Sequence, residues 1–124
     1  KLEEFSKDYD ELYFQIALNY GSRDEITRGM RKLAQDAADG RLNPQEITED
    51  TISGYLDTAG VPDPGLLIRT SGEQRLSNFL MWQLAYTEFY FTDVAWPDFH
   101  KEDLIRAIEK YNGRDRRYGG VKEE

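Results

Sequence analysis

Residues 66–78, "LLIRTSGEQRLSN", join an apolar run to a loop that carries two arginines, two serines and one glycine. Leu66, Leu67 and Ile68 have the character of a strand buried on both faces. A second apolar run begins at Phe79, so the loop is anchored on both sides. It therefore follows the carboxyl end of a strand, which is where open parallel sheets bind their ligands.

The side chains of this loop suit an anion. Arg69 directly follows the strand, Arg75 offers a planar fork of donors, and Ser77 stands where the next helix is expected to begin. Guanidinium groups bind phosphate oxygens in pairs, and a helix N-terminus favours negative charge. We therefore expect Arg69, Arg75 and Ser77 to bind an oxyanion, and a diphosphate in particular.

A simpler interpretation of these residues stays open. The arginines would pair with Glu73 or Glu88, and Ser77 would only cap a helix. Glu88 follows an apolar run, where a carboxylate costs free energy unless it is paired or bound to a metal. Mg²⁺ takes carboxylate and phosphate oxygens. Glu88 is thus either a magnesium ligand or the partner of Arg69 or Arg75.

Outward from the loop, apolar runs alternate with stripes of helical spacing. The run Leu12 to Leu18 predicts a strand, and Ser22 with Glu25 predicts a capping box that opens a helix. Strands are expected at residues 12–18, 66–68 and 89–94, and helices at residues 22–37, 44–59 and 79–86. A last helix is expected to bury Leu104, Ile105, Ile108 and Tyr111. The helix at 79–86 is apolar on nearly every face, so we expect the core or a partner subunit to enclose it.

This alternation predicts an α/β fold, with a mostly parallel β-sheet flanked by helices. With 124 residues, 39% of them apolar, we expect a single domain at 1–124 with its own core and a polar tail at 112–124. Three strands make a thin sheet, so the missing strands are expected upstream of Lys1 or in another chain. Because the chain opens at Lys1 without methionine, we expect it to be a piece of a longer polypeptide.

Composition excludes several classes of function. The net charge of −8 argues against a nucleic-acid surface, which needs clustered cations. The chain has no cysteine and one histidine, His100, which excludes thiolate chemistry and a histidine metal cluster. No apolar run is long enough to span a membrane, and no secretory leader is evident, so a soluble, cytoplasmic protein is expected.

Residues 66–99, "LLIRTSGEQRLSNFLMWQLAYTEFYFTDVAWPDF", together with "RDRRYGG" at 114–120, closely resemble the C-terminal half of the cis-prenyltransferases, the undecaprenyl diphosphate synthases in particular. The resemblance runs from about Leu18 to Gly120. It implies a transferase that condenses isopentenyl diphosphate onto an allylic diphosphate such as farnesyl diphosphate, using Mg²⁺ and working as a homodimer. The long-chain polyprenyl diphosphate product serves as a cell-wall lipid carrier, which leaves room for peripheral contact with a membrane at product release.

The resemblance also implies roles for individual residues. Arg69, Arg75, Leu76 and Ser77 would hold the diphosphate of isopentenyl diphosphate, and Glu88 would bind magnesium. The family's glycine-rich "DGNGRWA"-type motif, with its catalytic aspartate, is absent from the sequence. No catalytic residue is therefore expected in this chain, which should be inactive alone.

Three residues have less definite roles. Asp93 is a strand-end cap or part of the site, and Asp98 belongs to a turn that supports substrate binding indirectly. Arg117 opens an Arg-x-Gly motif that the resemblance directs to the active site of a partner subunit. Two alternatives to an enzyme segment stay open: a non-catalytic partner or dimerisation subunit, and an unrelated phosphate-binding α/β domain.

Overall fold

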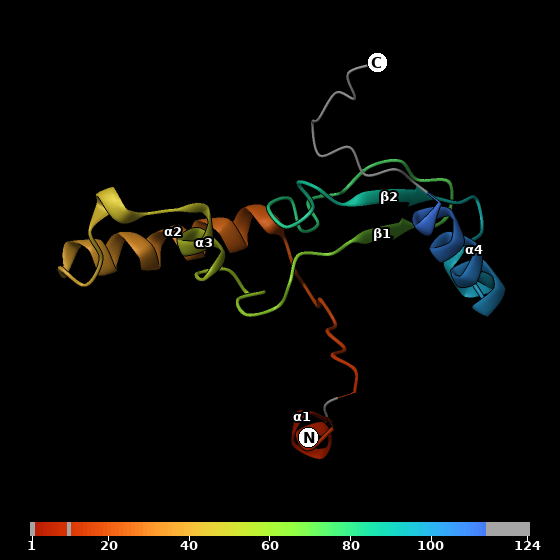
Figure 1. The fold of residues 1–124 in the computed structure, drawn as a ribbon, viewed down its shortest axis with the longest axis horizontal. Helices are drawn as coiled ribbons and strands as arrows, with labels where there is room; N and C mark the ends of the chain where they lie inside the picture. The colour runs from red at the N-terminus through yellow and green to blue at the C-terminus, as the bar shows by residue number, and fades with distance from the viewer. Residues whose placement is uncertain (1, 10, 114–124) are drawn as a thin grey trace.

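The computed structural model describes residues 2–9 and 11–113. Figure 1 shows α2 and α3 on one side of the molecule, and the two strands with α4 on the other. In chain order the elements are α1 (Leu2–Ser6), α2 (Ser22–Ala38), the 3₁₀ helix η1 (Pro44–Glu46), α3 (Glu49–Ser53), β1 (Leu66–Arg69), β2 (Glu88–Phe91), the 3₁₀ helix η2 (Trp96–Asp98) and α4 (Lys101–Asn112).

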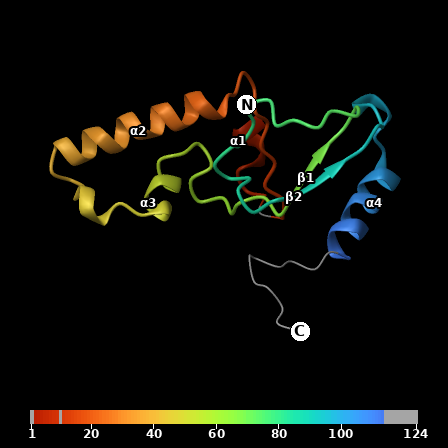
Figure 2. The same ribbon diagram turned by 90° about the horizontal axis from the view of Figure 1, so that it is seen from above.

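The two strands form a parallel pair. Leu66 lies opposite Glu88, and Arg69 lies opposite Phe91. Figure 2 shows α4 running alongside this pair, and Lys110 places its ammonium group over the ring of Tyr90 on β2, 5.5 Å from the ring centre. A parallel sheet with helices confirms the predicted α/β class, and the strands predicted at 66–68 and 89–94 are confirmed with shifted ends.

Helix α2 is confirmed nearly as predicted, but its capping box is wrong. Gly21 is the N-cap residue and makes no side-chain cap. Ser22 and Glu25 are both fully buried. The Ser22 hydroxyl accepts a hydrogen bond from the Met81 backbone N–H at 2.9 Å, and Glu25 is engaged by residues outside the helix, so neither is available to cap.

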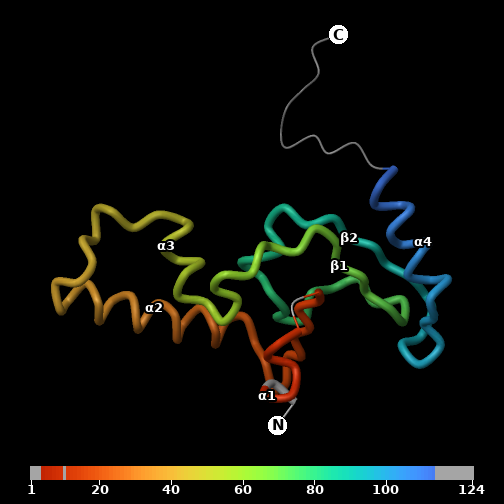
Figure 3. Tube along the Cα trace, turned by 60° about the horizontal axis from the view of Figure 1, so that its bottom comes forward, coloured from red at the N-terminus to blue at the C-terminus, as the bar shows by residue number. Residues whose placement is uncertain are grey.

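The predicted strand at 12–18 is wrong. The segment is irregular and connects α1 to α2 (Figure 3), and Figure 1 shows it descending below the strands. Its large apolar side chains are exposed, from 64% at Ile16 to 84% at Tyr13. A strand buried on both faces needs neighbouring strands to pair its backbone, and the sheet of the described residues contains β1 and β2 alone.

The helix predicted at 79–86 is also wrong, because the segment forms a series of turns. Ser77, Asn78 and Leu80 have φ values of 50°, 63° and 44°. This left-handed backbone cannot start a right-handed helix. The helix predicted at 44–59 is reduced to η1 and α3, because the Thr48 hydroxyl caps a new helix start at 3.2 Å from the Thr51 N–H.

The core of the described residues is thin. Its buried apolar side chains are Leu33, Leu56, Leu84 and Ala107. Gly29 lets α2 pack closely, because a Cβ there would lie 3.0 Å from the carbonyl oxygen of Tyr55. The predicted inner face of α4 is wrong in part: Leu104, Ile105 and Ile108 are each 42% exposed. The helix instead buries Asp103 and Ala107, and the residues that the structure describes form no large apolar core.

None of the described helices is long and apolar enough to cross a membrane.

Candidate functional site

Arg69 ends β1 and leads into a loop whose backbone is bound to the segment after β2. The N–H groups of Ser71 and Gly72 donate to the carbonyl oxygens of Val94 and Thr92, each at 2.9 Å. Gly72 has a φ of +69°, and a Cβ there would lie 3.1 Å from Oδ1 of Asp93. Glycine is therefore favoured at this reversal, because it adopts a positive φ without strain and leaves room for Asp93. The loop that follows Arg69 has a fixed origin at the carboxyl ends of both strands.

Arg75 and Ser77 lie further along the same segment and are exposed. Arg75 forms an ion pair with Glu73, as the simpler interpretation of the sequence expected. The Arg75 side chain is 65% exposed, and an exposed pair contributes only about 0–1 kcal/mol. A diphosphate presents several charged oxygens to a guanidinium group and can therefore displace Glu73.

The expected contribution of a helix N-terminus at Ser77 is wrong. Turns follow Ser77 instead of a helix, so no helix dipole of its own segment lies behind the hydroxyl. Leu76 is half-buried and accepts a hydrogen bond from the Phe79 N–H at 3.0 Å. The backbone of this segment is thus held by turns and by hydrogen bonds to the start of α2.

Glu88 and Arg69 lie at opposite ends of the strand pair. Glu88 is the first residue of β2, opposite Leu66, whereas Arg69 is the last residue of β1. Three residues along a strand correspond to about 10 Å. The sheet alone therefore does not bring the predicted magnesium ligand next to Arg69.

A single carboxylate at Glu88 fits magnesium as one ligand among several. The described residues hold no group of three or more carboxylate or histidine side chains that could bind a metal ion. Mg²⁺ usually keeps several waters and takes one or two carboxylates plus phosphate oxygens. The remaining ligands would have to come from substrate or from residues other than these.

Two hollows lie near the strands and α3, and none of the predicted site residues lines either. The larger, about 590 Å³, is lined by Ile68, Trp96, Phe99, His100, Lys101 and Leu104. Side chains alternate along a strand, so Ile68 and Arg69 belong to opposite faces of β1. The smaller, about 190 Å³, lies beside α3 at Trp82 and Gln83. Neither of these two hollows is therefore lined by Arg69, Arg75, Ser77 or Glu88.

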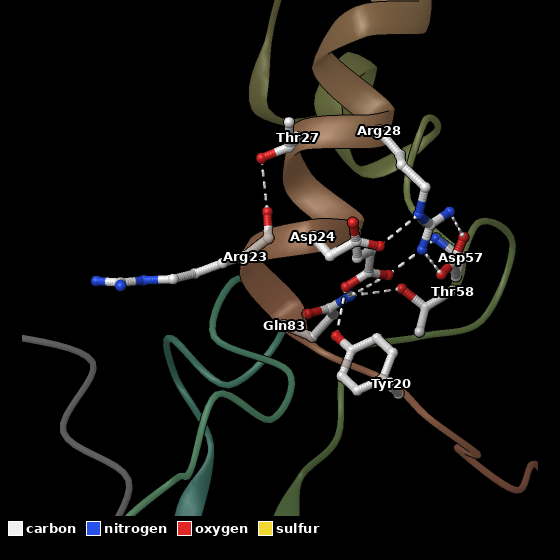
Figure 4. Close-up of polar contacts among 9 residues, drawn as sticks. Tyr20, Arg23, Asp24, Thr27, Arg28, Asp57, Thr58 and Gln83 are labelled. Carbon is white, nitrogen blue, oxygen red and sulfur yellow. Dashed lines mark hydrogen bonds and ion pairs between the residues drawn. The ribbon is translucent and has the colours of Figure 1, made fainter.

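A buried polar cluster beside the loop was not predicted from the sequence. Glu25 on α2 accepts hydrogen bonds from the hydroxyl of Tyr20, from the Asp57 N–H at 2.9 Å and from Nε2 of Gln83 at 3.3 Å. Burial, and then the hydrogen bond to Glu25, raise the pKa of Tyr20 to about 12. Gln83 also donates to the Thr58 hydroxyl at 2.9 Å (Figure 4).

Arg28 adds a second link between α2 and the segment after α3. Its guanidinium group donates to both carboxylate oxygens of Asp57, at 3.0 and 2.6 Å, and to Asp24 at 2.8 Å (Figure 4). The hydrogen bonds from Arg28 lower the pKa of Asp57 below its ordinary value. The sequence contains one signal for this cluster. Ser22 and Glu25 share helical spacing with Leu33, so their polar side chains lie on the buried stripe of α2.

Two of the less definite residues are also located. Asp93 lies against the backbone of Gly72, and Asp98 is an exposed residue of η2. Arg117 and its motif lie outside the described residues.

Comparison with known proteins decides the family. The sequence profile described as "Putative undecaprenyl diphosphate synthase" matches residues 1–119. The chain belongs to this prenyltransferase family. It is 59% identical over 106 residues to an isoprenyl transferase of Rhizobium meliloti, covering 86% of this chain and 43% of that protein. It is 58% identical over 110 residues to an isoprenyl transferase of Geobacillus kaustophilus, covering 89% of this chain and 43% of that protein.

Solved structures of this prenyltransferase family confirm the fold. A lavandulyl diphosphate synthase from Lavandula x intermedia, solved in complex with dimethylallyl diphosphate, matches with a TM-score of 0.91 and 44% identity, over 94% of this chain and 50% of that one. A "probable undecaprenyl diphosphate synthase" from Campylobacter jejuni matches with a TM-score of 0.79 and 34% identity, over 95% and 52%. The resemblance to the family is confirmed, and the chain spans about half of the length of the relatives it matches.

Proposed function

We propose that this chain is the isopentenyl-diphosphate-binding half of a cis-prenyltransferase of the undecaprenyl diphosphate synthase type. The observation that carries the proposal is the segment 69–77, in which Arg69, Arg75 and Ser77 follow one another on a loop bound to the ends of both strands. In a chain that belongs to a prenyltransferase family, this set of donors suits a diphosphate.

The role of the segment is positioning. The allylic C–O bond breaks with carbocation character, and isopentenyl diphosphate must be held in the orientation that lets its double bond attack. Arg69 and Arg75 would bind the diphosphate oxygens, and the Ser77 hydroxyl would donate to the same group. Leu76, half-buried between them, would fix the spacing of the two polar side chains.

Magnesium bound at Glu88 would neutralise charge on diphosphate oxygens. The half-buried carboxylate of Glu88 lies at the start of β2 and would act as one oxygen ligand. In this proposal, another part of the enzyme supplies the catalytic residues, the allylic diphosphate site and the remaining magnesium ligands. The complete enzyme acts as a homodimer and makes a long-chain polyprenyl diphosphate.

A second candidate function is a non-catalytic partner or dimerisation subunit. It is favoured by the apolar surfaces of the chain, since Leu12, Phe14 and Leu18 are 78–82% exposed and α4 exposes three large apolar side chains. Such surfaces mark sites that another chain or segment covers. A subunit with this role alone has no need of the donors at Arg69, Arg75 and Ser77.

The test is incorporation of labelled isopentenyl diphosphate onto farnesyl diphosphate. The 124-residue chain and a version extended upstream are assayed with Mg²⁺ and with excess EDTA. We expect no incorporation by the chain alone and magnesium-dependent incorporation by the extended protein. A folded extended protein that incorporates nothing, with or without Mg²⁺, would contradict the proposed function and favour the partner subunit.

A further inference from the structure

Asn78, the residue after Ser77, caps helix α2 from a distance of 55 residues in sequence. The first N–H groups of a helix have no partner within the helix. Here the Ser22 N–H donates to the carbonyl oxygen of Asn78 at 2.8 Å, and the Arg23 N–H donates to its side-chain Oδ1 at 2.9 Å. Gly21, the N-cap residue of α2, has no side chain to do this. Asn78, on the neighbouring loop, therefore caps the N-terminus of α2.

A second contact holds the same turn on its other side. The Met81 N–H donates to the Ser22 hydroxyl at 2.9 Å, and Ser22 is fully buried. The first turn of α2 is thus hydrogen-bonded to the loop at two places, Asn78 and Met81. Figure 4 shows the side chain of Arg23 extending away from the polar cluster around Tyr20, and the hydrogen bond to Asn78 comes from the backbone N–H of Arg23.

These hydrogen bonds hold an unusual backbone conformation at Ser77 and Asn78. Ser77 and Asn78 have φ values of 50° and 63°, in the left-handed region that costs free energy for residues other than glycine. Asparagine tolerates this region better than most residues. The hydrogen bonds from Ser22 and Arg23 hold Asn78, and with it the backbone next to Ser77, in this conformation.

Gly21 is required for the close approach of Asn78. A Cβ at Gly21 would lie 2.8 Å from Nδ2 of Asn78, closer than real Cβ contacts allow. The backbone of Gly21 is extended, with φ of −148°, so alanine would fit the backbone there without strain. The main cost of Gly21→Ala would be the displacement of Asn78.

We infer that Asn78, seated against Gly21 and the first turn of α2, is a positioning residue that orients Ser77 and the preceding Arg75 toward the diphosphate of isopentenyl diphosphate. This inference rests on the proposed function. We place Asn78 out of contact with the substrate, so that it acts through Ser77 and Arg75. Its loss should raise the KM for isopentenyl diphosphate, while the KM for the allylic diphosphate stays unchanged.

The experiment is a double-mutant cycle in the complete enzyme, with KM and kcat measured for both substrates and thermal unfolding used to check folding. The variants are Gly21→Ala, Asn78→Gly and the two together. Glycine at position 78 keeps the left-handed backbone and removes only the side chain. Gly113→Ala is the matched control, because Gly113 is right-handed with φ of −81° and a Cβ there meets nothing closer than 3.5 Å.

Each single variant should raise the KM for isopentenyl diphosphate about fivefold to tenfold, as expected for one lost hydrogen bond. The double variant should be no worse than Asn78→Gly, because the clash needs the asparagine side chain. Asn78→Asp keeps the Oδ1 acceptor and should restore a near-normal KM. The inference is overturned if Asn78→Gly leaves this KM unchanged, or if Gly21→Ala adds its full effect in the absence of the side chain.

A parallel measurement on Arg75→Ala separates this inference from the proposed function. A raised KM in Arg75→Ala with no change in folded Asn78→Gly would overturn the role of Asn78 and leave the diphosphate site intact. No change in Arg75→Ala would remove Arg75 from the diphosphate site, and with it the inferred role of Asn78 in orienting Arg75.

Discussion

At the scale of single residues, Arg75 is the most informative side chain. It is paired with Glu73 on an exposed surface, and such pairs are weak because water screens both charges. A diphosphate can replace one carboxylate with several charged oxygens, so the pair does not argue against a binding role. The ion pair in the structure and the proposed ligand are alternatives for the same guanidinium group.

We expect Arg75→Ala in the complete enzyme to raise the KM for isopentenyl diphosphate about tenfold or more, because a charge-assisted hydrogen bond to the ligand is lost. The allylic KM should change much less. Steady-state incorporation kinetics with each substrate varied in turn will measure both. Arg31→Ala, an exposed arginine on α2, is the matched control and should leave both constants unchanged. Equal constants in Arg75→Ala and wild type would remove Arg75 from the site.

The sequence predicts that Arg69, Arg75 and Ser77 share one loop, and the structure places them at the end of β1 and in the segment that follows it; their binding of a diphosphate stays a prediction. The sequence was not sufficient to predict Asn78 or Glu25. Their partners, Arg23 and Gln83, lie 55 and 58 residues away, and only the folded chain brings them together. Residue type reveals local chemistry, whereas a cap supplied by a distant loop leaves no local pattern.

At the scale of elements, the start of α2 depends on a buried carboxylate. Glu25 is fully buried and satisfies donors on Tyr20, Asp57 and Gln83. We expect Glu25→Ala to lower the free energy of unfolding by about 3 kcal/mol, since buried donors would lose their acceptor. Urea unfolding followed by circular dichroism will measure it. Asp24→Ala, one residue along and 75% exposed, should change the free energy by less than about 1 kcal/mol. Equal losses in the two variants would contradict this role.

The contribution of helix α4 to stability should depend on pH in the acid range. The His100 N–H donates to Oδ2 of Asp103 at 2.8 Å, and this bond, followed by the charge of Arg106, lowers the pKa of Asp103. A lowered folded-state pKa gives stability that is complete above the unfolded value of about 4 and is lost as the pH falls through the folded value. Asp103→Asn should therefore melt below wild type at neutral pH, and the two melting temperatures should converge in acid. A constant difference across the whole range would exclude this contribution.

The elements that the sequence predicted well are those whose pattern is completed locally. Helix α2 has a buried stripe, helix α4 buries Asp103 and Ala107 while its large apolar side chains stay partly exposed, and β1 and β2 pair with each other. The strand predicted at 12–18 needs partners on both sides, and the described residues supply none. The helix predicted at 79–86 is prevented by left-handed residues at 77 and 78, just before it, and at 80 within it.

At the scale of the whole molecule, the described residues expose more large apolar side chains than they bury. Large side chains at 12–18 and on α4 are exposed in the described part of the chain. We expect the native protein to have a mass of at least twice 14.5 kDa by light scattering, because these surfaces need a cover. Ile105→Glu should weaken the association, and Glu102→Gln on the same helix should not. A stable 14.5 kDa monomer that binds no hydrophobic dye would contradict the expectation.

The central claim is that the segment 69–77 holds the diphosphate of isopentenyl diphosphate, and a crystal structure of the complete protein with that substrate tests it most directly. We expect diphosphate oxygens within about 3 Å of the Arg69 and Arg75 guanidinium groups and of the Ser77 hydroxyl, with Arg75 released from Glu73. Diphosphate density elsewhere, with Arg75 still paired to Glu73, would contradict it.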